Sequence, residues 1–301
     1  MIRFLAILAA AAFSAAAAAQ QVPAAAAKMP RLERIAATNQ IVIGFRESSV
    51  PFAFHGRGGE AAGYGVDIAD AVAHAVKEHL KRPSLNVRHN AVTPVTLVPL
   101  MVNGVIDIEC GSTTNTLSRQ KVVAFSNTIF VSEVRLGVPA ASTVASLEDL
   151  RGKRVAVVAD TTTDRRIRTI DAERKLGMII QPARNNLRAF QALERGDADA
   201  FVAGNALLLG EFVRSGRRDA FKVVGDTIER EAFACVLPKD DPEFKRVVDA
   251  AIARLMASGE LARIYDRWFM QPLGRDVGAI GLPMSAELRA LIAAPNDRPI
   301  E

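Results

Sequence analysis

The sequence predicts an α/β protein with two similar lobes. Apolar runs of strand length alternate with runs whose apolar residues recur at helical spacing, and this alternation favours parallel sheets covered by helices. A helix that ends at glycine and leads into an apolar strand occurs in both halves, at Gly104 and at Gly196. Even without a cleaved leader, about 280 residues remain, which is enough for two domains of ordinary size.

The expected strands and helices follow one another along the chain. The expected strands are residues 41–45, 85–88, 105–109, 155–158, 178–181 and 198–203. The expected helices are residues 66–80, 97–102, 164–176 and 187–195, then two helices within 241–269 and a short one at 285–293. Ser258-Gly259 separates the two helices of the 241–269 stretch, and Pro272 ends the second because proline cannot continue a helix.

Residues 1–19 have the features of a secretory signal peptide in the right order. Arg3 supplies a positive start, residues 4–19 are apolar or small, and Ala17-Ala18-Ala19 offers a cleavage site. The apolar run is mostly alanine and is shorter than the roughly 20 residues that a membrane span needs. We therefore expect export to the periplasm, with a flexible tether over residues 20–35.

The composition argues against several classes of function. The formal net charge is +5, the basic residues are scattered among acids, and aromatic residues are scarce, so a nucleic-acid partner is not expected. The sequence has no phosphate-binding loop, hydrolase motif or metal-spaced His/Cys cluster, and we expect no cofactor and no metal. Cys110 and Cys235 could pair in an oxidising compartment, but sequence alone leaves that open.

Polar loops follow three of the expected strands. Arg46 follows the first, residues 111–115 and then Arg119 follow the third, and Asp160 to Asp164 follow the fourth. Ligands of open α/β sheets bind beyond the carboxyl ends of strands, and hydroxyls, helix N-termini and arginines all suit a carboxylate. The loops therefore predict a carboxylate pocket between two lobes. For Thr161 to Thr163 alone, helix capping is an equally good interpretation.

Three stretches make the chain resemble a known family. They are GFRESSVPFAF (residues 44–54), NGVIDIECGSTTNTLSRQKVVAFSNTIFV (residues 103–131) and LEDLRGKRVAV (residues 147–157). The chain resembles the family 3 extracellular solute-binding proteins, and within them the members that bind glutamate and aspartate. The resemblance implies the two-lobed type II periplasmic-binding-protein fold, which closes over its ligand about a hinge with two crossing segments near residues 130–135 and 226–233.

The resemblance also implies boundaries and partners. The first lobe would comprise residues 36–131 and 230–271, the second lobe residues 132–229, and residues 272–301 would form an extension packed on the first lobe. The protein would be a monomer that binds an amino acid, most similar to glutamate or aspartate, and delivers it to an ABC permease.

Site residues follow from the same resemblance. Arg119 would bind the α-carboxylate and Arg46 a side-chain carboxylate, because a buried carboxylate needs charge-assisted partners. The remaining candidates carry hydroxyl or amide groups and would bind the ligand's polar ends; they are Ser112, Thr114, Thr161, Thr162, Asn186 and Asn205.

The chain departs from its relatives at positions that matter for the ligand. Gly204 stands where the relatives carry the aspartate that pairs with the ligand's ammonium, and Asn186 stands in place of a pocket histidine. Pro94 and Leu97 stand where the glutamate/aspartate relatives have serine and arginine. Either Asp160 or Asn205 compensates for the missing acid, or the ligand has no ammonium.

Two alternatives follow from these departures. The first is a receptor for an amine-free dicarboxylate or keto acid. The second is a periplasmic dehydratase of the cyclohexadienyl type, which needs a general acid in the pocket. Glu47 and Glu109 are the acids beside the first-lobe loops, and neither sequence position indicates a poised acid, so we expect a binding protein and not an enzyme.

Overall fold

The computed structural model describes residues 29–274 and 277–300. The predicted signal peptide and the first part of the predicted tether lie outside these residues. Within them, no helix combines the length and the apolar character that a membrane crossing requires.

One large sheet runs through the molecule. Its strands are β1 (Gln40–Arg46), β5 (Asn86–Val92), β6 (Ile108–Glu109), β7 (Val123–Pro139), β8 (Arg154–Val158), β9 (Ile179–Ala183), β10 (Ala200–Gly204) and β11 (Phe221–Pro238). The sheet has eight strands in the order β5-β1-β6-β11-β7-β10-β8-β9. The predicted strand at 105–109 is shorter than expected, and that at 85–88 starts one residue later and extends to Val92.

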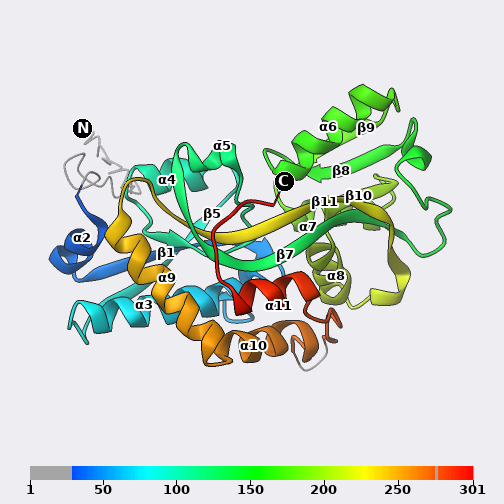
Figure 1. The fold of residues 1–301 in the computed structure, drawn as a ribbon. Coiled ribbons are helices and arrows are strands. Elements are labelled where there is room, and N and C mark those ends of the chain that lie inside the picture. The colour runs from blue at the N-terminus through cyan, green and yellow to red at the C-terminus, as the bar shows by residue number, and fades with distance from the viewer. Residues whose placement is uncertain (1–28, 275–276, 301) are drawn as a thin grey trace, which may run out of the picture.

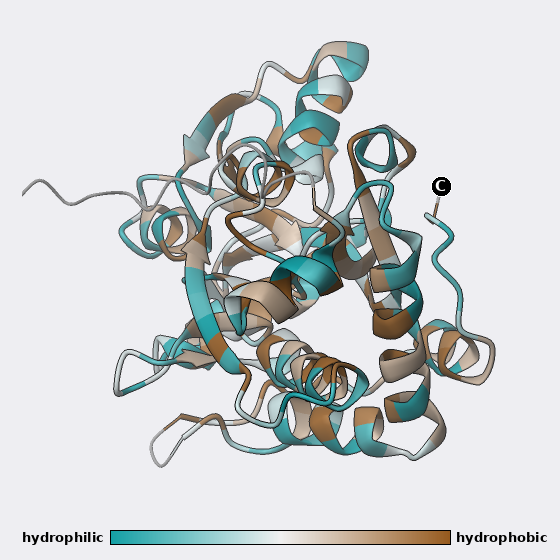
Figure 2. Ribbon diagram, turned by 90° about the vertical axis from the view of Figure 1, so that its left-hand side faces the viewer, coloured by the Kyte–Doolittle hydropathy of each residue, from teal (hydrophilic) through white to brown (hydrophobic). Residues whose placement is uncertain are grey.

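The helices cover the faces of this sheet. They are α2 (Arg31–Thr38), α3 (Tyr64–His79), α4 (Leu97–Val102), α5 (Leu117–Gln120), α6 (Thr162–Arg174), α7 (Asn186–Glu194), α8 (Asn205–Arg214), α9 (Pro242–Ala257), α10 (Glu260–Tyr265) and α11 (Ala286–Ala293). Short turns of other helix types lie at Glu148–Leu150, Arg218–Ala220 and Asp266–Met270. Hydrophobic and hydrophilic residues alternate around the helices (Figure 2), which is the pattern of helices that cover a sheet.

The sheet is parallel at both ends and antiparallel in the middle. Strand β1 pairs in parallel with β5 and β6 in one lobe, and β8 pairs in parallel with β9 and β10 in the other. Between them, β7 pairs in antiparallel fashion with β11 and β10. We call the part around β1, β5 and β6 the first lobe and the part around β8, β9 and β10 the second lobe (Figure 1).

The two lobes are joined by two long strands. The family resemblance implies crossing segments near residues 130–135 and 226–233, and these ranges lie within the 17-residue β7 and the 18-residue β11, respectively. The pairing of these strands shifts in register between Val224 and Glu229, and such irregularities bend a strand pair locally. Hydrophobic periodicity does not predict the length of these two strands, because each of them runs through both lobes and is buried in one lobe after the other.

A small second sheet lies beside the first lobe. It contains β2 (Ser48–Ser49), β3 (Ala53–His55) and β4 (Ala61–Ala62) in antiparallel order. The sequence pattern predicts a loop in this region, since strands of two or three residues are too short for a recognisable alternation.

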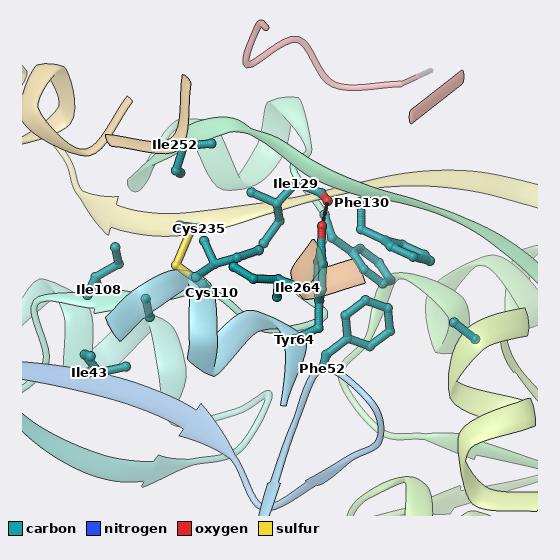
Figure 3. Close-up of a cluster of buried hydrophobic side chains, with 14 of the residues drawn as sticks. Ile43, Phe52, Tyr64, Ile108, Cys110, Ile129, Phe130, Cys235, Ile252 and Ile264 are labelled. Atoms are coloured by element: carbon teal, nitrogen blue, oxygen red, sulfur yellow. Dashed lines mark hydrogen bonds between the residues drawn. A yellow bond between two sulfur atoms is a disulfide. The ribbon is translucent and has the colours of Figure 1, made fainter. Parts of the chain in front are cut away.

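The core of the first lobe is aromatic. Phe52, Phe130, Phe233 and Phe269 are all buried, and the rings of Phe52 and Phe130 each contact the other three. The hydroxyl of Tyr64 beside them donates to the carbonyl of Ile129 at 2.6 Å (Figure 3), which gives this buried polar atom a partner.

Cys110 and Cys235 form a disulfide within this core (Figure 3). The bond joins the end of β6 to β11 across 125 residues of chain. It therefore resolves the pairing that the sequence leaves open. The loop that begins at Gly111 is anchored directly after it.

The predicted tether is shorter than expected. Residues 31–38 form α2, and Arg31 and Arg34 are buried against the carboxylate of Asp107. Asp107 also accepts a hydrogen bond from the backbone N–H of Val42 at 2.8 Å. Ion pairing of a buried carboxylate fixes the helix to the first strand, a contact that the local sequence cannot reveal.

The C-terminal extension lies along the long strands. Helix α11 packs on α9 and β7, and the segment after it crosses the joining strands (Figure 1). The carbonyl of Asn296 accepts from the N–H of Thr128 at 2.9 Å, and the carbonyl of Asp297 accepts from the side chain of Asn115 at 2.7 Å. The extension thus contacts the loop that follows β6.

Candidate functional site

A cavity lies in the cleft between the two lobes. Its described lining residues come from β1, β8, β10 and β11, from the loop after β6, and from helices α5, α6, α7 and α8. All the site residues that the sequence predicts, except Asn205, line this cavity; they are Arg46, Ser112, Thr114, Arg119, Thr161, Thr162 and Asn186. The remaining lining residues are Val158, Thr163, Val202, Ala203, Gly204, Leu207, Glu231 and Phe233.

The loop after β6 is held in place by β11. Thr114 forms an isolated antiparallel bridge with Phe233, and the N–H of Asn115 donates to the carbonyl of Ala232 at 2.8 Å. This pairing buries Thr114 beside the joining strand. It explains why residues of a loop and of a distant strand share one cavity.

Arg119 is positioned by the same loop. The hydroxyl of Thr116 accepts from the N–H of Arg119 and caps α5, and Arg119 Nη1 donates to the carbonyl of Thr114 at 2.8 Å. Burial lowers the pKa of Arg119 to about 10, and the positive charges of Arg46 and Arg165 contribute to that lowering. The guanidinium is still protonated at neutral pH. An anion in the cavity would offset both the cost of burying this charge and its repulsion by the other two arginines.

Arg46 is fully enclosed at the end of β1. Its Nη2 donates to the hydroxyl of Thr113 at 3.1 Å, and that hydroxyl donates to the carboxylate of Glu109 at 2.8 Å. Arg46 Nε is buried and has no hydrogen-bond partner among the described residues. Burial lowers the pKa of Arg46 and raises that of Glu109. Glu109 therefore supports Arg46 from behind, through Thr113, and does not line the cavity.

The second lobe contributes the N-terminus of α6. Thr161 is its N-cap: its hydroxyl accepts from the N–H of Asp164 and donates to the carbonyl of Val158. The capping interpretation of Thr161 is thus correct for its side chain, although the residue also lines the cavity. Thr162 differs, since its hydroxyl donates to Glu231 on β11.

Glu231 is a site residue that the sequence pattern does not indicate. It is 3% exposed, lines the cavity from β11 and accepts hydrogen bonds from Thr114 and Thr162. Burial raises its pKa, and the two hydroxyls and the nearby arginines oppose that rise. Glu231 lies in a long strand, 117 residues from Thr114, and no polar loop or motif surrounds it. Only the pairing of β11 with the loop after β6 brings it to the site.

Asn205 does not reach the cavity. Its side-chain oxygen accepts from the N–H groups of Ala206 at 2.8 Å and Glu133 at 3.5 Å, and it lines a different cavity behind β7. Asn205 is the first residue of α8, directly after the end of β10, and its side chain is held against the backbone of β7 through Glu133. Asp160 is exposed and is also absent from the lining. Neither residue fills the role that the sequence suggests for it.

Gly204 lines the cavity without providing any chemistry there. A Cβ atom at this position would overlap Ser132 Oγ of β7. Leu97 is 2% exposed in a separate core cluster, whereas Pro94 lines a smaller extension of the cleft together with Arg46, Asn186 and Arg184. This second cavity therefore adjoins the first at Arg46 and Asn186.

No group of three or more His, Cys, Asp or Glu side chains in the described part of the chain could hold a metal ion. The charges of the site are instead those of arginine and glutamate. Arg46, Arg119 and Glu231 line one cavity, and no salt bridge joins any of them within residues 29–274 and 277–300.

Two α/β lobes, joined by paired long strands and with a charged cavity between them, define a two-lobed binding protein. A family model agrees: that of the bacterial extracellular solute-binding proteins, family 3, matches residues 41–271. The chain belongs to this family, and its fold is the type II periplasmic-binding-protein fold.

Individual relatives cover almost the whole chain. The L-glutamate/L-aspartate-binding protein of Pseudomonas aeruginosa is 42% identical over 271 residues, 90% of this chain and 90% of that protein. The glutamate/aspartate import solute-binding protein of Salmonella typhimurium is 40% identical over 267 residues, 89% of this chain and 88% of that protein. Among solved structures, an ancestral arginine-binding protein bound to glutamine is 27% identical with a TM-score of 0.68, covering 77% of this chain and 98% of its own.

Proposed function

We propose that this protein binds an acidic amino acid and delivers it to an ABC importer. One observation carries the choice of ligand: two arginines and one glutamate line a single cavity between the lobes, and no salt bridge joins them within the described residues. Neighbouring charges of opposite sign offset part of the cost of burying these groups, but buried charges without a direct ion pair remain costly. A ligand with two carboxylates and one ammonium would complement all three.

Arg119 is assigned to the α-carboxylate in this proposal. It lies beside Ser112 and the N-terminus of α6, which supply a hydroxyl of the first lobe and backbone N–H groups of the second. Arg46 is assigned to the side-chain carboxylate, because it lies where the cleft continues toward Pro94 and Arg184. The names of the two relatives, which bind glutamate and aspartate, support the same class.

Delivery requires the lobes to open and close. Asn186 of the second lobe donates to Ser49 of the first at 3.2 Å, and Thr114 and Thr162 meet across the cleft at 3.2 Å. A ligand that contacts both lobes favours the closed form, which a permease can distinguish from the open one. We place the lobe boundaries within β7 and β11, near residues 131–132 and 229–230, with residues 272–301 as an extension of the first lobe.

Export to the periplasm and a monomeric state belong to the same proposal. The features of residues 1–19 support cleavage and export, and the disulfide suits an oxidising compartment. We also infer a receptor and not a dehydratase. Glu231 is the one acid among the described lining residues. It accepts hydrogen bonds from two hydroxyls, whereas a dehydratase needs an acid that is free to donate to a leaving group.

The experiment is a calorimetric titration of the ligand-stripped mature protein. L-Glutamate, L-aspartate, 2-oxoglutarate and succinate are added in turn, and the Arg119→Ala variant is titrated alongside. We expect the tightest binding with glutamate or aspartate. Tight binding of 2-oxoglutarate or succinate alone would assign the protein to amine-free acids, and no heat with any of the four would refute the proposed ligand class.

A further inference from the structure

The ligand's amino group has no evident partner on the second-lobe strand. Strand β10 ends at Gly204, and Asn205 after it faces another cavity. An ammonium buried without an anion is strongly disfavoured. An amino acid can therefore bind tightly only if an acid reaches the cavity from another element.

Glu231 meets that requirement by its position. It is 3% exposed, and it is the one acid among the described residues that line the cavity. Glu109 is equally buried but lies behind Arg46, and Asp160 is exposed outside the cavity. Glu229, two residues earlier on β11, is half-buried and does not line the cavity either.

The hydrogen bonds of Glu231 leave one of its oxygens available. Thr114 Oγ1 donates to Oε1 at 2.9 Å, and Thr162 Oγ1 donates to the same oxygen. The other oxygen, Oε2, accepts no hydrogen bond from the described residues and is not completely shielded from the cavity. A carboxylate has lone pairs for more donors than these two. An ammonium beside Thr114 can therefore bond to Oε2 without displacing either threonine.

Both lobes contribute to this carboxylate. Thr114 belongs to the loop after β6 in the first lobe, and Thr162 belongs to α6 in the second. Glu231 itself lies on a strand that joins them. A cation bound here contacts a group that is already hydrogen-bonded to each lobe, so its binding and the closed arrangement support each other.

We propose that Glu231 is the acceptor of the ligand's ammonium group and that it makes the protein selective for α-amino acids over amine-free dicarboxylates. The assignment rests on the proposed function and adds to it the residue that reads the amine. Burial, which raises the pKa of Glu231 in the empty cavity, is offset when a cation arrives.

The test compares L-glutamate with glutarate, which differ only by the amino group. Both are titrated into the wild-type protein, into Glu231→Gln and into Glu229→Gln. The glutamine at 231 keeps the size and the acceptor oxygen for the two threonines while removing the charge. Glu229→Gln is the matched control, since it neutralises a partly buried carboxylate on the same strand outside the cavity.

We expect wild type and Glu229→Gln to prefer glutamate strongly. The Glu231→Gln variant lacks one partner of a buried charge pair, so we expect it to bind glutamate at least about 30-fold more weakly than wild type. Its affinity for glutarate should be unchanged or higher. Equal weakening of both ligands would show that Glu231 only supports Thr114 and Thr162, and would overturn the inference. So would equal affinity of wild type for the two ligands. If wild type binds neither ligand, nor any acid of the first titration, the proposed function itself fails.

Discussion

Asn186 Nδ2 lies 3.2 Å from Ser49 Oγ and 3.2 Å from the carbonyl oxygen of Ser48, so one side chain of the second lobe bonds twice to the first. The sequence predicts Asn186 as a ligand-binding residue, and it does line the cavity. Its amide nevertheless donates to protein atoms across the cleft. The residue therefore has a structural part in closure that does not depend on ligand contact.

Replacing Asn186 by alanine should shift the protein toward the open form. Two bonds worth about 1 kcal/mol each are lost from the closed form alone, which predicts weaker ligand binding by roughly 3- to 30-fold. Small-angle X-ray scattering of the ligand-free variant should show a larger radius of gyration. Asn103→Ala, which removes an exposed amide bonded only within its own turn, is the control. An unchanged radius together with weaker binding would assign Asn186 to the ligand instead.

Replacing Arg119 by alanine should abolish ligand binding with little loss of fold. Its one described side-chain hydrogen bond joins it to the carbonyl of Thr114, and its burial as a cation is costly. The charge-assisted bonds to a carboxylate are lost outright, so we expect affinity to fall at least about 100-fold. Calorimetry and circular dichroism check the two halves of this prediction. Arg188→Ala, on the exposed surface of α7, should bind normally; unchanged affinity of Arg119→Ala would refute the assignment.

Introducing an aspartate at Gly204 should not improve binding. Its Cβ would overlap Ser132 Oγ, and a second carboxylate beside Glu231 would repel the first. We expect a loss of stability of about 1–3 kcal/mol from overpacking. The double variant Gly204→Asp with Ser132→Ala should recover part of that stability in urea unfolding. Tighter binding of L-glutamate by Gly204→Asp would mean that the cavity lacks an anion after all.

Replacing Glu211 by glutamine should stabilise the protein above neutral pH. Glu211 is 1% exposed on α8, and burial raises the pKa of its carboxyl from 4.5 to about 7, with Arg214 opposing the rise. The native carboxyl keeps its proton where the unfolded one has lost it. The stability gained from this group is thus complete below about pH 4.5 and is lost as the pH rises through about 7.

The free energy of unfolding falls by roughly 3 kcal/mol between these two pH values, because each pKa unit of the shift corresponds to about 1.36 kcal/mol. Glutamine can still accept from Arg214, which donates to Glu211 at 2.9 Å, but it has no proton to lose. Urea unfolding at pH 5 and pH 8 should show similar stabilities at pH 5 and a more stable variant at pH 8. Parallel pH dependence of the two proteins would contradict the raised pKa.

Removing the disulfide should destabilise the first lobe. Cys110 and Cys235 are 3% and 0% exposed, and they close a loop of 125 residues. The chain-entropy model gives about 5 kcal/mol for a loop of this length. The double variant Cys110→Ala with Cys235→Ala should therefore melt well below wild type in calorimetry. Because Cys110 directly precedes the loop that carries Ser112 and Thr114, ligand binding should also weaken; an unchanged melting temperature would show that packing alone holds this loop.

Local sequence patterns were sufficient to predict most helices and the strands near the ends of the sheet. Apolar spacing placed α3, α4 and α7 within two residues of their observed bounds. The three polar loops were also predictable, because hydroxyl and arginine residues directly after an apolar strand are typical of a binding loop. The same patterns could not indicate the length of β7 and β11, whose residues are buried in both lobes in turn.

The sequence by itself indicated two α/β halves and a leader-like start, and it predicted a carboxylate pocket built from Arg46, Arg119 and their neighbouring hydroxyls. These features are local in the chain and leave local signals. Tertiary structure alone decided that Glu231 enters the pocket, that Asn205 leaves it and that Asn186 bonds across the cleft. The reason is physical: strand pairing between residues more than a hundred positions apart sets which faces meet, and no local pattern encodes it.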